Sequence, residues 1–216
     1  MRNFLRSVMV GAVCVMGMSL LSPLAAQSPV NQQAVEGSVN IYNLDRDARV
    51  GGIEIQGRIG KAVANEAVKL LRSIRPDVDE LTVFLSSPGG DVFAAMELGE
   101  EIRRQWALTS VDDDGECFGA CVLVLAAGVR RTPASENVGL QRMSFAQKDV
   151  AKKVEAYLSR MGMPKKLFQE IAAQQSSNKL RLLNSDRLKA LGLEGIDPAY
   201  EQWLRANENQ ERSQPN

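Results

Sequence analysis

The chain has 216 residues, with 26 lysines and arginines against 26 aspartates and glutamates, and it contains no histidine. The missing histidine excludes a histidine general base and, with only three cysteines, leaves few side chains for a zinc site, so we expect no metal and no cofactor. The balanced charge provides neither a basic field for nucleic acid nor a polybasic patch for a membrane surface, so we expect no nucleic-acid partner.

The first 26 residues have the pattern of a secretory signal peptide. Two arginines precede an apolar stretch at 7–21, and small residues at 25–26 stand where a signal peptidase cuts. An uncleaved anchor would need about 20 apolar residues to cross the hydrocarbon core, and Pro23 comes too early for that. The sequence therefore predicts a periplasmic or secreted protein with no stable membrane anchor.

The segment after the signal peptide, 27–49, is polar and unpatterned, so we expect a flexible lead-in to a domain at 50–204. Residues 50–59 alternate isoleucines with polar residues, which predicts a strand that bends at Gly57. Apolar residues at helical spacing then predict a helix that ends before Pro76. Beyond the domain, the polar residues 205–216 are predicted to form a disordered tail.

The stretch at 81–92, LTVFLSSPGGDV, lies at the centre of the predicted domain. Its alternating apolar residues predict a strand, and apolar residues at helical spacing from Val92 to Ile102 predict the helix that follows. Gly89 and Gly90 stand between the two elements. Without a Cβ, they let the backbone approach a ligand with its N–H groups exposed, although a plain turn would use glycines as well.

A second small-residue turn opens the stretch at 115–128, GECFGACVLVLAAG. The apolar run after this turn has no polar face, so we expect a helix buried in the middle of the molecule. Apolar residues at 150–173, interrupted by Gly162 and Pro164, predict a helical hairpin, and a last helix is expected to end at Leu204. Strands that alternate with helices in this order indicate a parallel α/β arrangement.

The two turns and the elements around them resemble the Clp protease proteolytic subunit (ClpP) and the wider crotonase-like superfamily over about 53–195. This resemblance implies a β-β-α spiral with parallel sheets. It also implies an oxyanion hole formed by two backbone N–H groups, those of Gly90 and Ala120. Folds of this class bury apolar surface between subunits, so a homo-oligomer, either a trimer or a single ring, is expected as well.

The resemblance also implies that all three catalytic positions of the family are substituted. The nucleophilic serine stands nine residues before the glycine of an Ala-Ala-Gly segment, which here corresponds to Gly119. An ungapped alignment from Gly128 puts Gln141 at the histidine, and the segment around Leu183 puts Leu180 at the acid. Glycine has no nucleophile and glutamine takes no proton at neutral pH. We therefore predict a serine peptidase-like pseudoenzyme that binds a peptide or protein partner through the oxyanion hole.

Two alternatives remain open at this point. The protein could be an exported hydrolase that uses another nucleophile, for which the candidates are Cys121, Ser86, Ser87 and Ser144. It could also use crotonase-type acid and base groups beside the oxyanion hole, for which the candidates are Asp91 and Glu116. Cys117 and Cys121 are, however, the only cysteines after the signal peptide. An even pair in an oxidising compartment predicts a disulfide that braces the turn between them.

Overall fold

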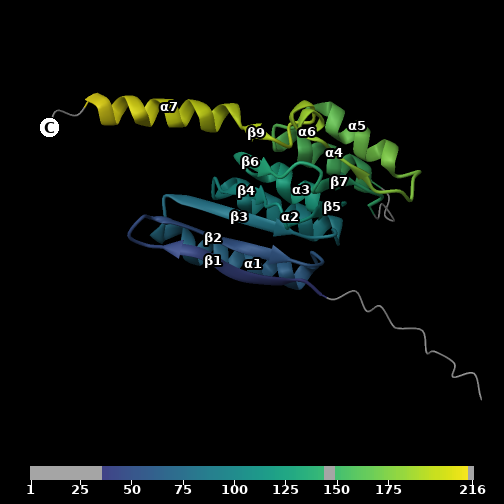
Figure 1. Ribbon diagram of the computed structural model, residues 1–216, viewed down its shortest axis with the longest axis horizontal. Helices are drawn as coiled ribbons and strands as arrows, with labels where there is room; N and C mark the ends of the chain where they lie inside the picture. Colours follow the sequence, from purple (N-terminus) through teal and green to yellow (C-terminus); the bar gives the residue numbers. More distant parts are fainter. Residues whose placement is uncertain (1–35, 144–148, 214–216) are drawn as a thin grey trace, which may run out of the picture. The chain divides into compact units, whose positions relative to one another are not determined.

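The computed structural model describes residues 36–143 and 149–213 (Figure 1). The predicted signal peptide at 1–26, the first part of the lead-in and Ser144 lie outside these ranges. None of the described helices combines the length and the apolar character that a membrane span requires.

The larger sheet has six strands within the described residues, in the order β1-β2-β3-β4-β6-β9. The central four strands are parallel, and β1 and β9 add to the two edges in antiparallel orientation. Their bounds are β1 Ser38–Asp45, β2 Val50–Gln56, β3 Glu80–Ser86, β4 Leu108–Val111, β6 Arg130–Pro133 and β9 Gly195–Ile196. The predicted parallel α/β arrangement is confirmed.

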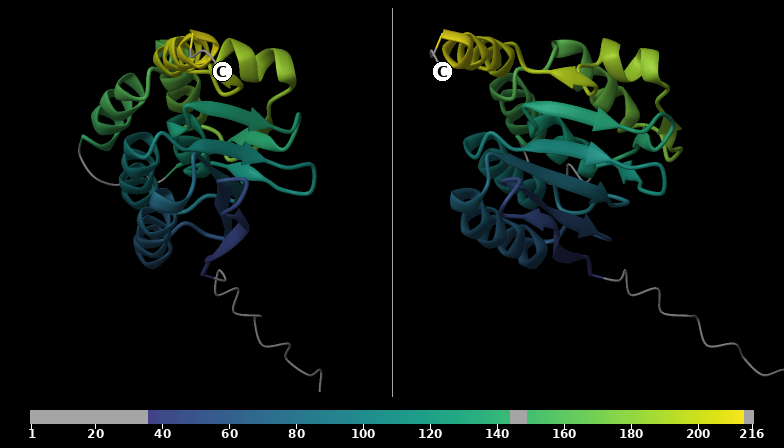
Figure 2. Two further views of the ribbon diagram at one scale, coloured as in Figure 1. Left: turned by 90° about the vertical axis from the view of Figure 1, so that its left-hand side faces the viewer. Right: turned by 60° about the vertical axis from the view of Figure 1, so that its left-hand side comes forward.

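Helices connect the parallel strands, and α1 and α2 lie together on one side of the larger sheet (Figure 2). Their bounds are α1 Lys61–Ile74, α2 Val92–Arg104, α3 Cys121–Ala127, α4 Val150–Arg160, α5 Lys165–Gln174, α6 Ser185–Ala190 and α7 Pro198–Ser213. Every residue of α3 is buried, as its unbroken apolar run predicts. The helical hairpin predicted for 150–173 is the α4–α5 pair, with Gly162 in the turn at φ +72°.

A smaller sheet of three strands, in the order β5-β7-β8, completes the described residues. It contains β5 Cys117–Phe118, β7 Val138–Leu140 and β8 Arg181–Leu182. A single parallel bridge between Ser87 and Cys117 connects it to the end of β3. The two glycine-containing turns therefore lie where the two sheets meet.

The early element predictions are confirmed close to their bounds. The bend after β2 falls on Gly57, whose φ of +75° is a backbone conformation that favours glycine. The first helix ends at Ile74, and Pro76 lies in the short 3₁₀ helix η1, Arg75–Asp77, that follows it.

Two segments predicted to be without structure form regular elements instead. In the lead-in predicted for 27–49, β1 pairs with β2, and its Val39 and Leu44 pack against the core. This edge strand forms because its backbone pairs with β2, and not because its own sequence alternates between apolar and polar residues. In the tail predicted for 205–216, α7 continues to Ser213. Its first turn is anchored by Tyr200, which packs on Leu108 and Val129.

Candidate functional site

The glycine turn after β3 and the turn before α3 are in direct backbone contact. The N–H of Ser87 donates to Glu116 O (2.6 Å), and the N–H of Phe118 donates to Ser87 O (3.0 Å). A Cβ on Gly89 would lie 2.8 Å from Phe118 O and 3.2 Å from Ala120 N. Only glycine therefore allows the two turns to approach this closely.

Gly90 is held in an extended glycine conformation, φ +154°, by hydrogen bonds on both sides of it. The N–H of Ile59 donates to Gly89 O (2.9 Å), and the N–H of Asp91 donates to Ile59 O (2.8 Å). A Cβ on Gly90 would lie 2.7 Å from Ile59 N. Among the described residues, the N–H groups of Gly90 and of Ala120 donate to no protein acceptor. Both predicted oxyanion-hole donors are thus unengaged.

The side chain of Gln141 lies against the backbone of Gly119. A Cβ on Gly119 would be 3.0 Å from Gln141 Nε2 and 3.1 Å from Gln141 Cγ. The same Nε2 donates to Pro88 O at 2.7 Å. Gly119 itself has φ +54° and donates its N–H to Gly139 O (3.3 Å). The carboxamide of Gln141 therefore occupies the space beside position 119 and ties β7 to the first turn.

Leu180 directly precedes β8 of the smaller sheet, and Gln141 directly follows β7. The antiparallel ladder between these strands pairs Gly139 with Leu182 and Leu140 with Arg181. A Cβ on Gly139 would contact Leu180 Cδ1 at 2.6 Å, and the Leu180 side chain is 42% exposed. The structure thus brings positions 119 and 141 into contact, and it places position 180 against Gly139, two residues before Gln141.

Cys117 and Cys121 form a disulfide, with their Cα atoms 5.2 Å apart. Both are fully buried, and they enclose Gly119 and Ala120 in the loop that they close. The predicted pairing is confirmed. A sulfur held in a disulfide is not a thiolate, so Cys121 is no nucleophile in this state.

Two other candidate side chains near the two turns, those of Ser87 and Asp91, have structural partners. Ser87 is fully buried, and its Oγ accepts from the N–H of Gly89 at 3.1 Å. Asp91 caps α2, because its Oδ1 accepts from the N–H of Ala94 at 2.8 Å. In the part of the chain that the structure describes, no three histidine, cysteine or acidic side chains gather closely enough to hold a metal ion.

Gln175 also helps to position the chain next to the site, and the sequence analysis did not identify it. Its Oε1 accepts from the N–H of Met143 at 3.2 Å, and its Nε2 donates to Ile171 O at 2.9 Å. It therefore fixes the chain just beyond Gln141 to the end of α5. A lone glutamine after an amphipathic helix carries no periodicity or spacing signal that would have identified it.

Comparison with known proteins supports the same fold. No protein-family model matches the chain, and no curated protein matches it. Among solved structures, it is similar to the ClpP protease catalytic domain from Plasmodium falciparum, with a TM-score of 0.53 and 17% identity over 70% of this chain and 84% of that one. It is also similar to ClpP1 from Listeria monocytogenes, with a TM-score of 0.52 and 17% identity over 70% of this chain and 93% of that one. The chain has a ClpP-like α/β fold.

Proposed function

We propose that this protein is an exported ClpP-like domain without peptidase activity, which binds a peptide or a protein partner at the two turns around Gly90 and Ala120. The position of Gln141 carries this proposal. Its carboxamide fills the space that a side chain at position 119 would use, and it is neutral at every ordinary pH. A site with glycine, glutamine and leucine at its three central positions has neither a nucleophile nor a base.

The two free N–H groups support a binding role. Unengaged N–H groups held in a fixed geometry can donate to a carbonyl oxygen without reorganising. They remain in place although the side chains around them supply no chemistry. We expect the occupant to be a peptide carbonyl, offered either by a separate protein or by another copy of this chain in a homo-oligomer.

A proline at position 120 tests the binding role. Ala120 has φ −63°, which a proline ring adopts, so Ala120→Pro removes the N–H and leaves the local backbone angle unchanged. Ala120→Gly keeps the N–H and is the matched control. Peptides selected from a display library on the wild-type protein should bind Ala120→Pro at least tenfold more weakly and Ala120→Gly almost normally. Equal binding by all three proteins would place the peptide elsewhere.

The absence of activity needs its own experiment. We expect the purified protein to react with neither a serine-directed fluorophosphonate nor a nitrophenyl ester. The alternative is a hydrolase with a non-standard nucleophile, for which Ser86, Ser87 and Ser144 are the candidates. Stoichiometric labelling at one residue, together with ester hydrolysis that the same label abolishes, would establish the alternative and refute the pseudoenzyme.

Export rests on the first 26 residues alone. We expect the mature chain to begin at Gln27 and to be released with the periplasmic or extracellular fraction. N-terminal sequencing of the protein from its native host decides this. An intact Met1 in the membrane fraction would contradict it.

A further inference from the structure

Among the described residues, α1 and α2 lie on one face of the larger sheet, and the opposite face is in contact with a helix only at the amino end of β4, where Tyr200 of α7 packs. Ile53, Val83 and Thr109 are neighbours in the register and point to the covered side, where Thr109 Oγ1 donates to Leu125 O of α3 at 2.9 Å. Figure 2 shows α1 and α2 on this side of β1, β2 and β3 and, in the described residues, no helix opposite them. Parallel strands are normally covered on both faces, so the bare face is unusual.

The bare face carries a continuous row of side chains across five strands. The register places Asn40, Glu54, Phe84, Ser110 and Thr132 next to one another. Only the amino end of this face is covered, where Leu108 packs on Tyr200 of α7. Phe84 remains partly exposed and packs edge to face on Tyr42, with ring centroids 4.7 Å apart. The carboxyl ends of the strands stay open.

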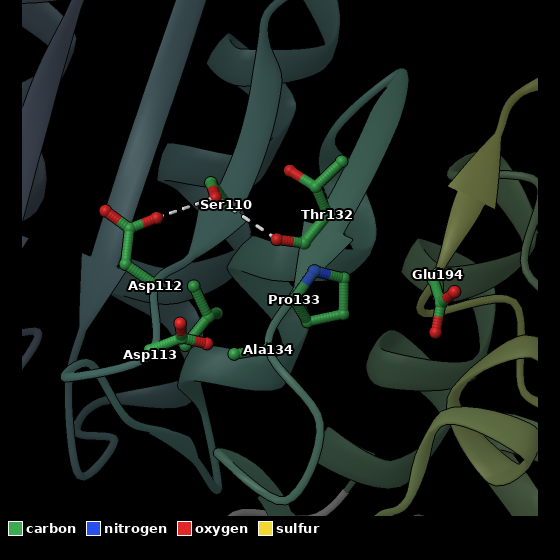
Figure 3. Close-up of a pocket in the computed structure, with 8 residues that line it drawn as sticks. Ser110, Asp112, Asp113, Thr132, Pro133, Ala134 and Glu194 are labelled. Carbon is green, nitrogen blue, oxygen red and sulfur yellow. Dashed lines mark hydrogen bonds between the residues drawn. The ribbon is translucent and has the colours of Figure 1, made fainter.

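Two cavities adjoin this face at the carboxyl ends of the strands. The larger, about 470 Å³, lies beside β4 and β6, and the smaller, about 90 Å³, lies beside β2 and β3. Asp112 lines both, so the two cavities are neighbours, and we call them together the groove. Figure 3 shows Asp112 and Asp113 on one side of the larger cavity and Glu194 across from them. Ligands of open α/β sheets lie at this edge of the strands.

The charge in this groove has one sign. The two cavities are lined by the carboxylates of Glu54, Asp112, Asp113, Asp114 and Glu194, and no lysine or arginine lines either of them. Glu194 lies 3.4 Å from Lys189, whereas Asp112, Asp113 and Asp114 form no ion pair with any described residue. A groove of this kind attracts a cationic partner and repels an acidic one.

We propose that the bare face and its groove bind an extended, basic segment of a partner protein. Three strand spacings separate β2 from β6, about 14 Å, which an extended segment of about four residues spans. Lysine or arginine side chains would meet the aspartates, and an aliphatic residue between them would pack on Phe84. The smaller cavity reaches Ser86 and Gly115, which lead into the two turns. The inference uses neither the N–H of Gly90 nor that of Ala120, so it does not depend on the proposed function.

A peptide titration with charge-neutral variants tests the inference. The probe is a fluorescein-labelled octapeptide of alternating lysine and alanine, and binding is followed by anisotropy at two salt concentrations. We expect binding that weakens with salt and becomes about tenfold weaker in Asp112→Asn/Asp114→Asn. The control is Glu66→Gln/Glu155→Gln, which removes the same charge from α1 and α4 and should bind like wild type.

Each other result overturns the inference. Equal binding of a glutamate–alanine octapeptide would mean that binding does not depend on the charge of the peptide. Equal losses in both double variants would mean that binding follows the net charge of the protein and not the groove. Displacement of the peptide by an equimolar amount of spermidine would assign the groove to a small polycation. Self-association in sedimentation that the groove variant abolishes, without peptide binding, would assign the face to a second copy. Loss of octapeptide binding in Ala120→Pro would assign the peptide to the turns around Gly90 and Ala120 instead of the groove.

Discussion

The hydroxyl group of Tyr157 occupies the space where a Cβ on Gly99 would lie. Gly99 is in the middle of α2, and Tyr157 reaches it from α4 and donates to Leu123 O of α3 at 2.8 Å. One buried tyrosine of α4 therefore contacts both α2 and α3, and α3 is the helix that follows the Gly119 turn. The contact is possible only because α2 has a glycine at this point.

Gly99→Ala should destabilise the protein by about 2–3 kcal/mol or more, because the new methyl group forces Tyr157 out of its position in a packed core. The free energy of unfolding from urea denaturation measures this. Gly60→Ala is the control, since the nearest atom to its new Cβ would be 3.8 Å away, and it should cost less than about 1 kcal/mol. Equal losses in the two variants would contradict the packing argument.

Glu101 should make the protein sensitive to acid. Its side chain is almost fully buried and accepts hydrogen bonds from Arg72 (2.8 Å) and Gln105 (2.7 Å). The hydrogen bond from Arg72 is the main cause that lowers the pKa of the Glu101 carboxyl below its ordinary value of 4.5. A lowered pKa in the folded state means that the stabilisation is complete above about pH 4.5 and is lost as the pH falls through the lowered value.

Glu101→Gln should therefore cost about 1–3 kcal/mol at pH 7 and should flatten the loss of stability below pH 4.5. Denaturation curves of wild type and variant from pH 7 to pH 3 measure both effects. Glu97→Gln, an exposed change on the same helix, should leave the pH profile unchanged. Parallel profiles for wild type and Glu101→Gln would contradict this role of Glu101.

Rebuilding the three substituted positions should restore a slow esterase. Gly119→Ser alone should be inert, because a serine without a base is a poor nucleophile, and it carries the added cost of a side chain at φ +54°. Adding Gln141→His supplies the base and removes the carboxamide that blocks the new side chain. Adding Leu180→Asp places a carboxylate on a residue that packs on Gly139, two residues before position 141, so the triple variant should be the fastest.

Initial rates of nitrophenyl acetate hydrolysis by the four proteins check this order. The matched control is Gly119→Ala/Gln141→His/Leu180→Asp, which has the same backbone constraints and no hydroxyl group. A triple variant no faster than this control would show that the three positions do not form a working site.

The Cys117–Cys121 disulfide should be present in every molecule and should stabilise the fold. Mass spectrometry of the non-reduced protein should show a mass two hydrogens below that of the reduced chain. Cys117→Ala/Cys121→Ala should lower the free energy of unfolding by about 2 kcal/mol, because closing a loop of this length removes little entropy from the unfolded chain. Two thiols that react with iodoacetamide after unfolding without reductant would contradict the pairing.

The backbone frame of the site was predictable, and the contacts inside it were not. Gly89, Gly90 and Gly119 stand out in the sequence because each interrupts an apolar pattern where the chain changes direction. The hydrogen bond from Gln141 to Pro88 O joins residues 53 positions apart, and no local pattern reports such a pair. Sequence reasoning therefore located the turns without showing that a carboxamide lies between them.

The missed elements have a related cause. Val39 and Ile41 alternate over too short a span to be distinguished from a polar linker, and 52% of the Ile41 side chain remains exposed in the finished strand. In the helical spacing from Val92 to Ile102, Gly99 looks like any other position on the helix face. Its meaning depends on Tyr157, which enters the structure 58 residues later in the chain.

The complete burial of α3 has a consequence for how any ligand would be selected. A helix without a solvent face cannot shift unless the surrounding layers open, so its amide protons should exchange only when the whole domain unfolds. The Gly119–Ala120 turn continues directly into this helix. The Cys117–Cys121 disulfide joins the first residue of β5, Cys117, to the first residue of the helix, Cys121. An incoming ligand therefore meets a surface that cannot remodel, and it must have the matching shape before it arrives.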